Sequence, residues 1–211
     1  MTKALLIVDV QNDFTEGGAL GVDGGAAVAS GVTDLLAAHG DEYALVIASR
    51  DWHDADNDNG GHFATAGDPD FVETWPEHCV AGTDGAEYHP SLDTSGVHAH
   101  IRKGQGKPAY SAFEGVDDEG RTVSQLLDEH GVTDVDVVGI ATDYCVRASA
   151  LDAVEHGRHV RIFTDLVAGV APESSERALA ELAHAGAVLA ESSVLAESPV
   201  PQEERSDEAS E

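Results

Sequence analysis

The chain has 211 residues, which is enough for one domain with a substantial core and short for two. Its 40 aspartates and glutamates against 11 lysines and arginines give a formal net charge of −29, which argues against nucleic acid or anionic membranes as partners. No apolar run approaches the length of a membrane span, and an expected strand begins at Lys3, which leaves no room for a signal peptide, so we expect a cytoplasmic protein.

Strand and helix patterns alternate from the start of the chain. Residues 3–10 form a near-continuous apolar run with Asp9 near its end, the pattern of a central parallel strand. A helix is expected at 26–39 and a second strand at 43–49. The following stretch, 50–90, shows little regular pattern, and a loop of this length in a compact domain is usually functional or disordered. Its aromatic residues and histidines argue against disorder.

The second half of the chain continues the alternation. Further strands are expected at 97–102, 134–140, 159–164 and 187–190, and further helices at 122–130, 143–156 and 172–185. Strands that alternate with helices form parallel βαβ units. The predicted fold is therefore α/β: a Rossmann-like, doubly wound, three-layer arrangement around a mainly parallel sheet of about six strands.

Four polar residues from different expected strands fall at or just past the strand ends: Asp9, Asp51, Lys103 and Cys145. Any one of them alone would be interpreted as a turn former or a cap. Ligands of such sheets, however, bind at the carboxyl ends of the strands, where all four would converge.

Cys145 lies at a strand-to-helix turn, where free N–H groups and the helix macrodipole favour a thiolate and could hold an oxyanion. A buried structural cysteine is the alternative from the turn alone. As a nucleophile, Cys145 would use Asp9 as its base, while Lys103 could keep Asp9 ionised and stabilise the thiolate.

Asp51 and the histidines of the long stretch form a second candidate group. Asp51 and His53 flank one residue, so their side chains point the same way if strand geometry persists. His62 and His78 would be delivered by the loop. One carboxylate and three imidazoles suit one divalent ion such as Zn, Fe or Mn, with positions left for water or ligand. Solvated loop histidines are the alternative, because the spacing forms no short regular motif.

Residues 3–190 resemble the isochorismatase-like cysteine hydrolases, and more narrowly their nicotinamidase (pyrazinamidase) branch. The resemblance rests on segments 4–14, 49–53, 62–63, 75–80, 110–113 and 139–146. The segment around Cys145 is typical of the whole family, and the aspartate with three histidines is typical of the branch. Two departures are the acidic segment 54–61, which is longer than in the family, and Tyr144, where some relatives have histidine.

The resemblance implies hydrolysis of nicotinamide to nicotinate and ammonia through a thioester, with pyrazinamide as a further substrate. It implies that the backbone N–H groups of Ala141 and Cys145 form the oxyanion hole, beside a cis peptide between Ile140 and Ala141. The metal, held by the aspartate and the three histidines, would bind the pyridine nitrogen. The residues that the resemblance places around the ring are Phe14, Trp75, Tyr110, Ala141 and Tyr144.

Two other functions stay open on the sequence. A relative that acts on a different small amide, carbamoyl or ureido substrate would not need the histidines. A catalytically silent binding protein would not need Asp9, Lys103 and Cys145 together. Exposed sheet edges and a large loop are compatible with a homo-oligomer.

The acidic residues are spread over expected helix faces and loops rather than gathered in one tract. Such a surface over an ordinary core pattern indicates a halophilic protein, since concentrated salt screens self-repulsion. Residues 192–211 differ: they are polar and acidic, contain Pro199 and Pro201, and show no periodicity. We expect a disordered tail there, after a single domain at 1–191.

Overall fold

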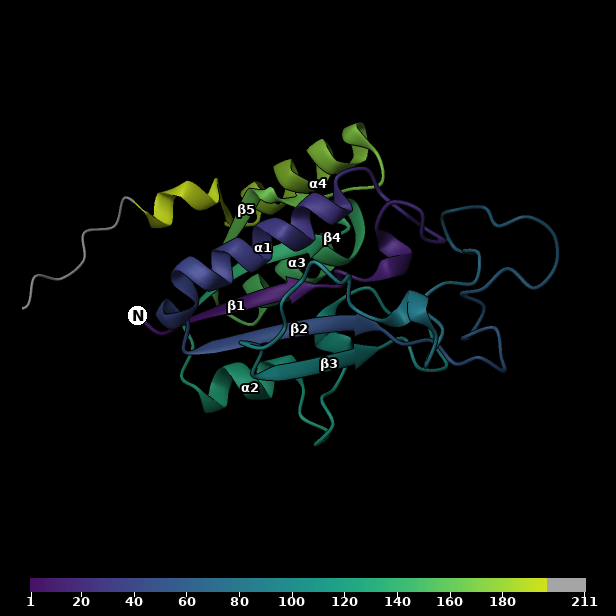
Figure 1. Cartoon of the computed structure of the whole chain (residues 1–211), viewed down its shortest axis with the longest axis horizontal. Helices are drawn as coiled ribbons and strands as arrows, with labels where there is room; N and C mark the ends of the chain where they lie inside the picture. The colour runs from purple at the N-terminus through teal and green to yellow at the C-terminus, as the bar shows by residue number, and fades with distance from the viewer. Residues whose placement is uncertain (197–211) are drawn as a thin grey trace, which may run out of the picture.

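Six parallel strands form the centre of the computed structural model, which describes residues 1–196 (Figure 1). The strands are β1 (Lys3–Val8), β2 (Leu45–Asp51), β3 (Ala99–Lys103), β4 (Asp134–Ile140), β5 (His159–Ala168) and β6 (Val188–Ala190). Their order across the sheet is β3-β2-β1-β4-β5-β6, and all neighbouring pairs are parallel. The predicted fold class is confirmed. The strand order reverses between β1 and β4, where sheets of this kind open a crevice at their carboxyl ends.

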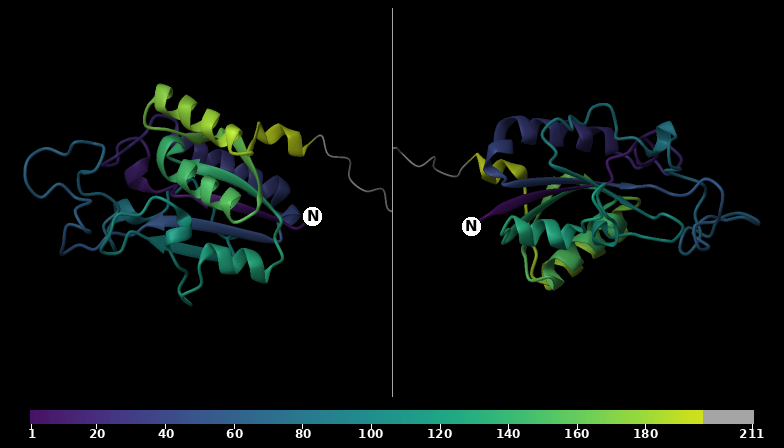
Figure 2. Two further views of the ribbon diagram at one scale, coloured as in Figure 1. Left: turned by 180° about the vertical axis from the view of Figure 1, so that it is seen from behind. Right: turned by 90° about the horizontal axis from the view of Figure 1, so that it is seen from below.

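Helices cover both faces of the sheet, giving three layers (Figure 2). The α-helices are α1 (Gly25–His39), α2 (Val123–Glu129), α3 (Arg147–Glu155) and α4 (Pro172–His184). Short 3-10 turns are η1 (Asn12–Phe14), η2 (Gly40–Glu42), η3 (Asp84–Ala86), η4 (Ala112–Glu114) and η6 (Ser192–Leu195), and η5 (Thr142–Val146) is a π-helical turn. Helix α1 lies on one face, and α2, α3 and α4 lie on the other. Within residues 1–196, no helix has both the length and the apolar character needed to cross a bilayer.

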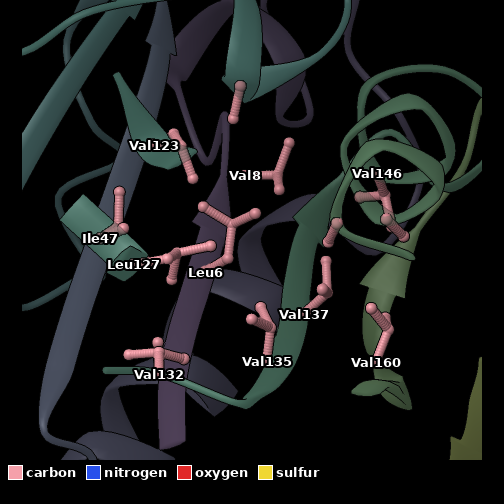
Figure 3. Packing of buried hydrophobic residues seen from close by; sticks show 14 of the residues in the cluster. Leu6, Val8, Ile47, Val123, Leu127, Val132, Val135, Val137, Val146 and Val160 are labelled. Atoms are coloured by element: carbon pink, nitrogen blue, oxygen red, sulfur yellow. The ribbon is translucent and has the colours of Figure 1, made fainter. Parts of the chain in front are cut away.

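The core is built on β1, which is buried on both faces. Leu6 lies beside Leu127 of α2, and Val8 and Val137 of β4 belong to the same cluster (Figure 3). Alternate residues of β1, such as Ile7, belong to the second cluster, under α1. Burial on both sides explains why this strand is a continuous apolar run rather than an alternating one.

Several predicted boundaries move in the structure, for local reasons. Strand β1 ends at Val8 rather than residue 10, because Asp9 takes a left-handed conformation with φ of 47°. Strand β2 continues to Asp51 because Asp51 pairs with Lys103 of β3. The helix predicted at 143–156 is divided into η5 and α3, since the N–H of Val146 bonds to the carbonyl five residues before it.

The prediction of a disordered tail from residue 192 onward is wrong for residues 192–195. Ser192–Leu195 forms η6, in which the N–H and hydroxyl of Ser192 both donate to the carboxylate of Asp165. The side chain of Leu195 is 3% exposed and packs on the face covered by α1. A single short turn has no periodicity for sequence reasoning to detect. The rest of the predicted tail, 197–211, lies outside the described residues.

Candidate active site

Four adjacent strands each bring one predicted residue to the carboxyl edge of the sheet. Lys103 ends β3, Asp51 ends β2, Asp9 follows β1, and Cys145 lies in η5 after β4. The Lys103 Nζ is 2.9 Å from Asp9 Oδ2 and 3.6 Å from Cys145 Sγ, and it also contacts the carboxylate of Asp51. All four residues are buried. The convergence predicted from the strand ends is therefore present, with the single ammonium group at its centre.

Burial controls the protonation of this group. It raises the pKa of the Asp9 carboxyl, although the nearby Lys103 opposes the rise. It raises the pKa of the Cys145 thiol well above its usual range, and the two carboxylates add to that effect. Burial and the two carboxylates thus favour the thiol, so formation of the thiolate calls for a base such as the one predicted at Asp9. Asp9, with its own pKa raised, is correspondingly a stronger base.

The turn that carries Cys145 is tied at both ends. The peptide between Ile140 and Ala141 is cis, as the family resemblance implies, and the Ala141 carbonyl accepts the N–H groups of Tyr144 and Val146, each at 3.1 Å. The Asp143 carboxylate accepts the N–H of Val170 at 3.0 Å, just before α4.

Close approach of β1 to β4 sets the distance between Asp9 and this turn. Gly139 has φ of 120°, and a Cβ there would lie 2.1 Å from the carbonyl oxygen of Val8, its partner in the ladder. Only glycine fits such a contact. The reactive atoms of Asp9, Asp51 and Cys145 consequently lie within 4.8 Å of one another.

Three histidines form a second buried group beside Asp51. Candidate ligand atoms of His53, His62 and His78 lie within 4.8 Å of one another. The Nδ1 of His53 donates to the Gly104 carbonyl and the Nδ1 of His78 donates to the Pro76 carbonyl, each at 2.8 Å. A carbonyl only accepts, so each ring keeps its proton on Nδ1 and presents a lone pair on Nε2.

The donor set fits a divalent metal. The Nε2 of His53 and the Nδ1 of His62 are buried without a hydrogen-bond partner, a costly state unless a ligand is present. Asp51 Oδ2 lies 3.7 Å from the Nε2 of His53 and 3.8 Å from that of His78. Buried imidazoles with a carboxylate are typical zinc ligands. All four predicted ligands are therefore brought together.

The protonation states agree with that donor set. Burial lowers the pKa of His62 to about 4 and also lowers the pKa of His78, so both are neutral at pH 7. Burial alone would raise the pKa of Asp51, but Lys103 and His53 hold it below its usual value. The group thus presents neutral imidazoles and an ionised carboxylate, the forms that bind metal.

The loop that delivers His62 and His78 is held by individual polar bonds rather than by regular structure. Asn59 is fully buried, and its Oδ1 accepts the N–H groups of Asp54 and Gly106 at 2.8 and 3.1 Å. These bonds close the long acidic segment 54–61. The N–H of Trp75 then donates to the His62 carbonyl at 2.9 Å, which joins the two arms of the loop.

A cavity of about 460 Å³ connects the two groups. It is lined by Cys145 and also by Asp51, His62 and His78. Every residue expected around the ring also lines it: Phe14, Trp75, Tyr110, Ala141 and Tyr144. The Trp75 indole donates to the Tyr110 hydroxyl at 3.0 Å and meets the Tyr144 ring edge-on at 5.1 Å.

Sequence reasoning missed two residues here. The Ser49 hydroxyl donates to Asp9 Oδ1 at 2.7 Å and so fixes the candidate base. Ser49 precedes Asp51 by two residues on an apolar strand, so a shared face was the available signal. Phe71, 53% exposed, stands at the cavity next to Trp75 with no comparable signal.

Comparisons with known proteins cover the whole sheet and both residue groups. A family model described as the isochorismatase domain matches residues 3–193. The nicotinamidase/pyrazinamidase of Mycobacterium tuberculosis is 51% identical over 187 residues, which cover 89% of this chain and 97% of the relative. A solved pyrazinamidase of Pyrococcus horikoshii in complex with zinc is 39% identical, with a TM-score of 0.77, and covers 90% of this chain and 99% of its own. An L. infantum protein solved in complex with nicotinate is 38% identical, with a TM-score of 0.76, at 91% and 93% coverage.

Proposed function

Because the chain belongs to the isochorismatase family, we propose that it is a metal-dependent nicotinamidase that converts nicotinamide to nicotinate and ammonia and also accepts pyrazinamide. One observation carries the proposal: a single cavity is lined both by Cys145 and by His62 and His78 of the buried histidine group. Amide hydrolysis needs the nucleophile, and the histidine group provides a way to hold a ring nitrogen through a metal.

The residues of the chain divide the work of substrate binding. Phe14 and Trp75 enclose the flat ring, and the hydroxyl of Tyr110 holds the Trp75 indole in place. A divalent metal held by Asp51, His53, His62 and His78 would supply a Lewis acid for the pyridine nitrogen, which orients the ring. Zinc is the first of the three candidate metals to test, since the P. horikoshii structure holds zinc.

The reaction runs through a thioester. Asp9 takes the proton of Cys145 as the sulfur forms a bond to the carboxamide carbon, and Lys103 offsets the negative charge on both. Asp9 then gives that proton to the nitrogen, and ammonia leaves as the C–N bond breaks. Water, deprotonated by Asp9, hydrolyses the thioester, which releases nicotinate and returns the thiol.

Backbone N–H groups of Ala141 and Cys145 stabilise the oxyanion of each tetrahedral intermediate. Both residues line the cavity on the turn fixed by the Ala141 carbonyl and by Asp143. One such donor is typically worth about 10²–10³ in kcat.

The decisive experiment measures ammonia release from nicotinamide, pyrazinamide and a ureido compound, using protein loaded in turn with Zn²⁺, Fe²⁺ and Mn²⁺. Cys145→Ala serves as the matched blank. We expect turnover of both carboxamides and none by the blank. Turnover of the ureido compound alone would favour the alternative family activity, and no turnover of any substrate would favour a silent binding protein.

The same proposal covers the setting of the enzyme. It places a single domain (1–191, extended by the packed turn at 192–195) in the cytoplasm of a halophile, open to homo-oligomer formation. The net charge of −29 supports the halophilic setting and the absence of nucleic acid or membrane partners. A melting series in KCl tests the halophilic setting.

A further inference from the structure

Gln11 makes a set of hydrogen bonds that none of the proposed roles uses. Its side chain is fully buried, two residues after Asp9. Its Oε1 accepts the backbone N–H of Asp51 at 2.8 Å, and its Nε2 donates to the backbone carbonyl of Asp51 at 2.9 Å. The same Nε2 donates to the carbonyl of Ala86 at 2.8 Å.

This contact replaces a missing piece of the sheet. Pairing between β1 and β2 ends at Ile7 and Ala48, because the chain turns away at Asp9. Asp51 therefore has Lys103 of β3 on one side and no β1 residue on the other. The carboxamide of Gln11 offers one acceptor and one donor, as a peptide group of a continued β1 would, so both buried backbone groups of Asp51 are paired.

Fixing the backbone of Asp51 fixes its carboxylate. That carboxylate contacts Lys103 on one side and faces the Nε2 atoms of His53 and His78 on the other, at 3.7 and 3.8 Å. We propose that Gln11 is a positioning residue that holds Asp51 in place for the metal site, an inference that rests on the proposed function. Gln11 acts through the main chain and touches neither metal nor substrate.

The test is Gln11→Glu, which keeps the shape but turns the donor into an oxygen facing the carbonyls of Asp51 and Ala86. Zn²⁺ affinity is measured without substrate, by competition with a chromophoric chelator. We expect it to fall by about 10- to 100-fold, the usual effect of losing an outer partner of a metal ligand. Gln11→Met, of similar size but without polar atoms, serves as the second variant and should give the same loss.

Tyr43→Phe is the matched control. Tyr43 is also buried, and its hydroxyl donates to Asp136 at 2.9 Å. Tyr43 precedes β2, whereas Asp51 is the last residue of that strand. Its loss should lower the melting temperature but leave Zn²⁺ affinity unchanged. In each variant, the rise in melting temperature on adding Zn²⁺ gives an independent measure of affinity.

Two results would overturn the role of Gln11 alone: Gln11 variants with wild-type Zn²⁺ affinity and a wild-type Zn²⁺-induced rise in melting temperature, or an equal loss of affinity in Tyr43→Phe. A wild-type protein that binds no Zn²⁺ would instead overturn the proposed metal site, and the role of Gln11 with it. Because no arm depends on amide hydrolysis, failure of the inference and failure of the proposed activity are separable.

Discussion

The two residue groups that share the cavity are built in different ways. Asp9 and Lys103 stand at the ends of paired strands, and Cys145 is in the turn directly after β4. His62 and His78 come from the loop between β2 and β3, which contains no α-helix or strand. Strand register holds the first group, whereas separate side-chain and carbonyl bonds hold the second. We therefore expect the groups to respond independently to perturbation, the nucleophile group as a fixed unit and the histidine group as an adjustable one.

Replacing the nucleophile should produce the largest effect. Cys145→Ser and Cys145→Ala are each expected to lower kcat for nicotinamide by at least about 10⁴-fold, because a serine hydroxyl is a far weaker acid than a thiol. Ammonia release in single-turnover assays measures this loss.

Cys79→Ser is the control for that change. Cys79 is also buried, but its sulfur faces the Gly85 carbonyl at 3.9 Å, and it does not line the cavity. Most activity should remain. An equal loss in the two serine variants would remove the assignment of Cys145.

Metal removal by a strong chelator is the next largest perturbation and the direct test of independence. We expect KM for nicotinamide to rise by roughly 30- to 100-fold, the loss of one strong polar contact of about 2–3 kcal/mol. The rate at which a small alkylating reagent modifies Cys145 should change little, since Asp9 and Lys103 stay in place. Added Zn²⁺ should restore KM.

Asp51 contacts Lys103 of the first group and lies 3.7 Å from the Nε2 of His53 in the second. A change of about tenfold or more in Cys145 alkylation on metal removal would therefore mean that the groups act as one unit. Unchanged KM and kcat in the metal-free protein would remove the role of the histidines in orienting the ring.

Gly104→Ala should disturb the histidine group alone, and by a smaller amount. Gly104 has φ of +84°, and a Cβ there would lie 2.6 Å from the His53 ring. We expect Zn²⁺ affinity to fall by about tenfold as His53 shifts and its bond to the Gly104 carbonyl weakens. Chelator competition measures the change.

Gly120→Ala separates the clash from backbone strain. Gly120 has φ of +80°, and a Cβ there would meet nothing within 4 Å, so the variant carries the same strain without a neighbour to displace. Both variants should lose about 1 kcal/mol of stability. If Gly120→Ala weakens Zn²⁺ binding as much as Gly104→Ala does, the contact with His53 is not the cause of the weaker binding.

Of these perturbations, salt should change the nucleophile group least, but it should change the melting temperature measurably. The loop carries exposed acids, including Asp56, Asp58 and Asp68, whereas the ion pair of Lys103 with Asp9 is fully buried and poorly screened. Because acids greatly outnumber bases, the melting temperature should rise with KCl from about 0.1 M to about 2 M, as the Debye length falls from about 10 Å to below about 3 Å. An unchanged melting temperature in metal-loaded protein would mean that the acidic surface is not a salt adaptation.

The nucleophile group was predictable from the sequence because each of its residues follows a strand pattern, and the carboxyl ends of parallel strands lie at one edge of the sheet. Sequence reasoning reached the histidines mainly through family resemblance, since the partners that fix their ring protons are the carbonyls of Gly104 and Pro76, which any residue would offer. The turn indicated what favours a Cys145 thiolate but not the burial that raises the pKa of its thiol, because burial depends on the whole fold. Gln11 lay inside a recognised segment, yet its bonds to Asp51 cross 40 positions in the sequence.

The pairing of Val8 with Gly139 also determines where the chain can gain or lose residues. An insertion in the exposed turn at 118–120 alters no pairing among the six strands and should be tolerated. Deleting one residue inside β1 would shift Asp9 by about 3.3 Å and turn its side chain to the opposite face of the sheet. Length variation among natural descendants of this chain should therefore accumulate in the turns, while the lengths of β1 and β4 stay constant.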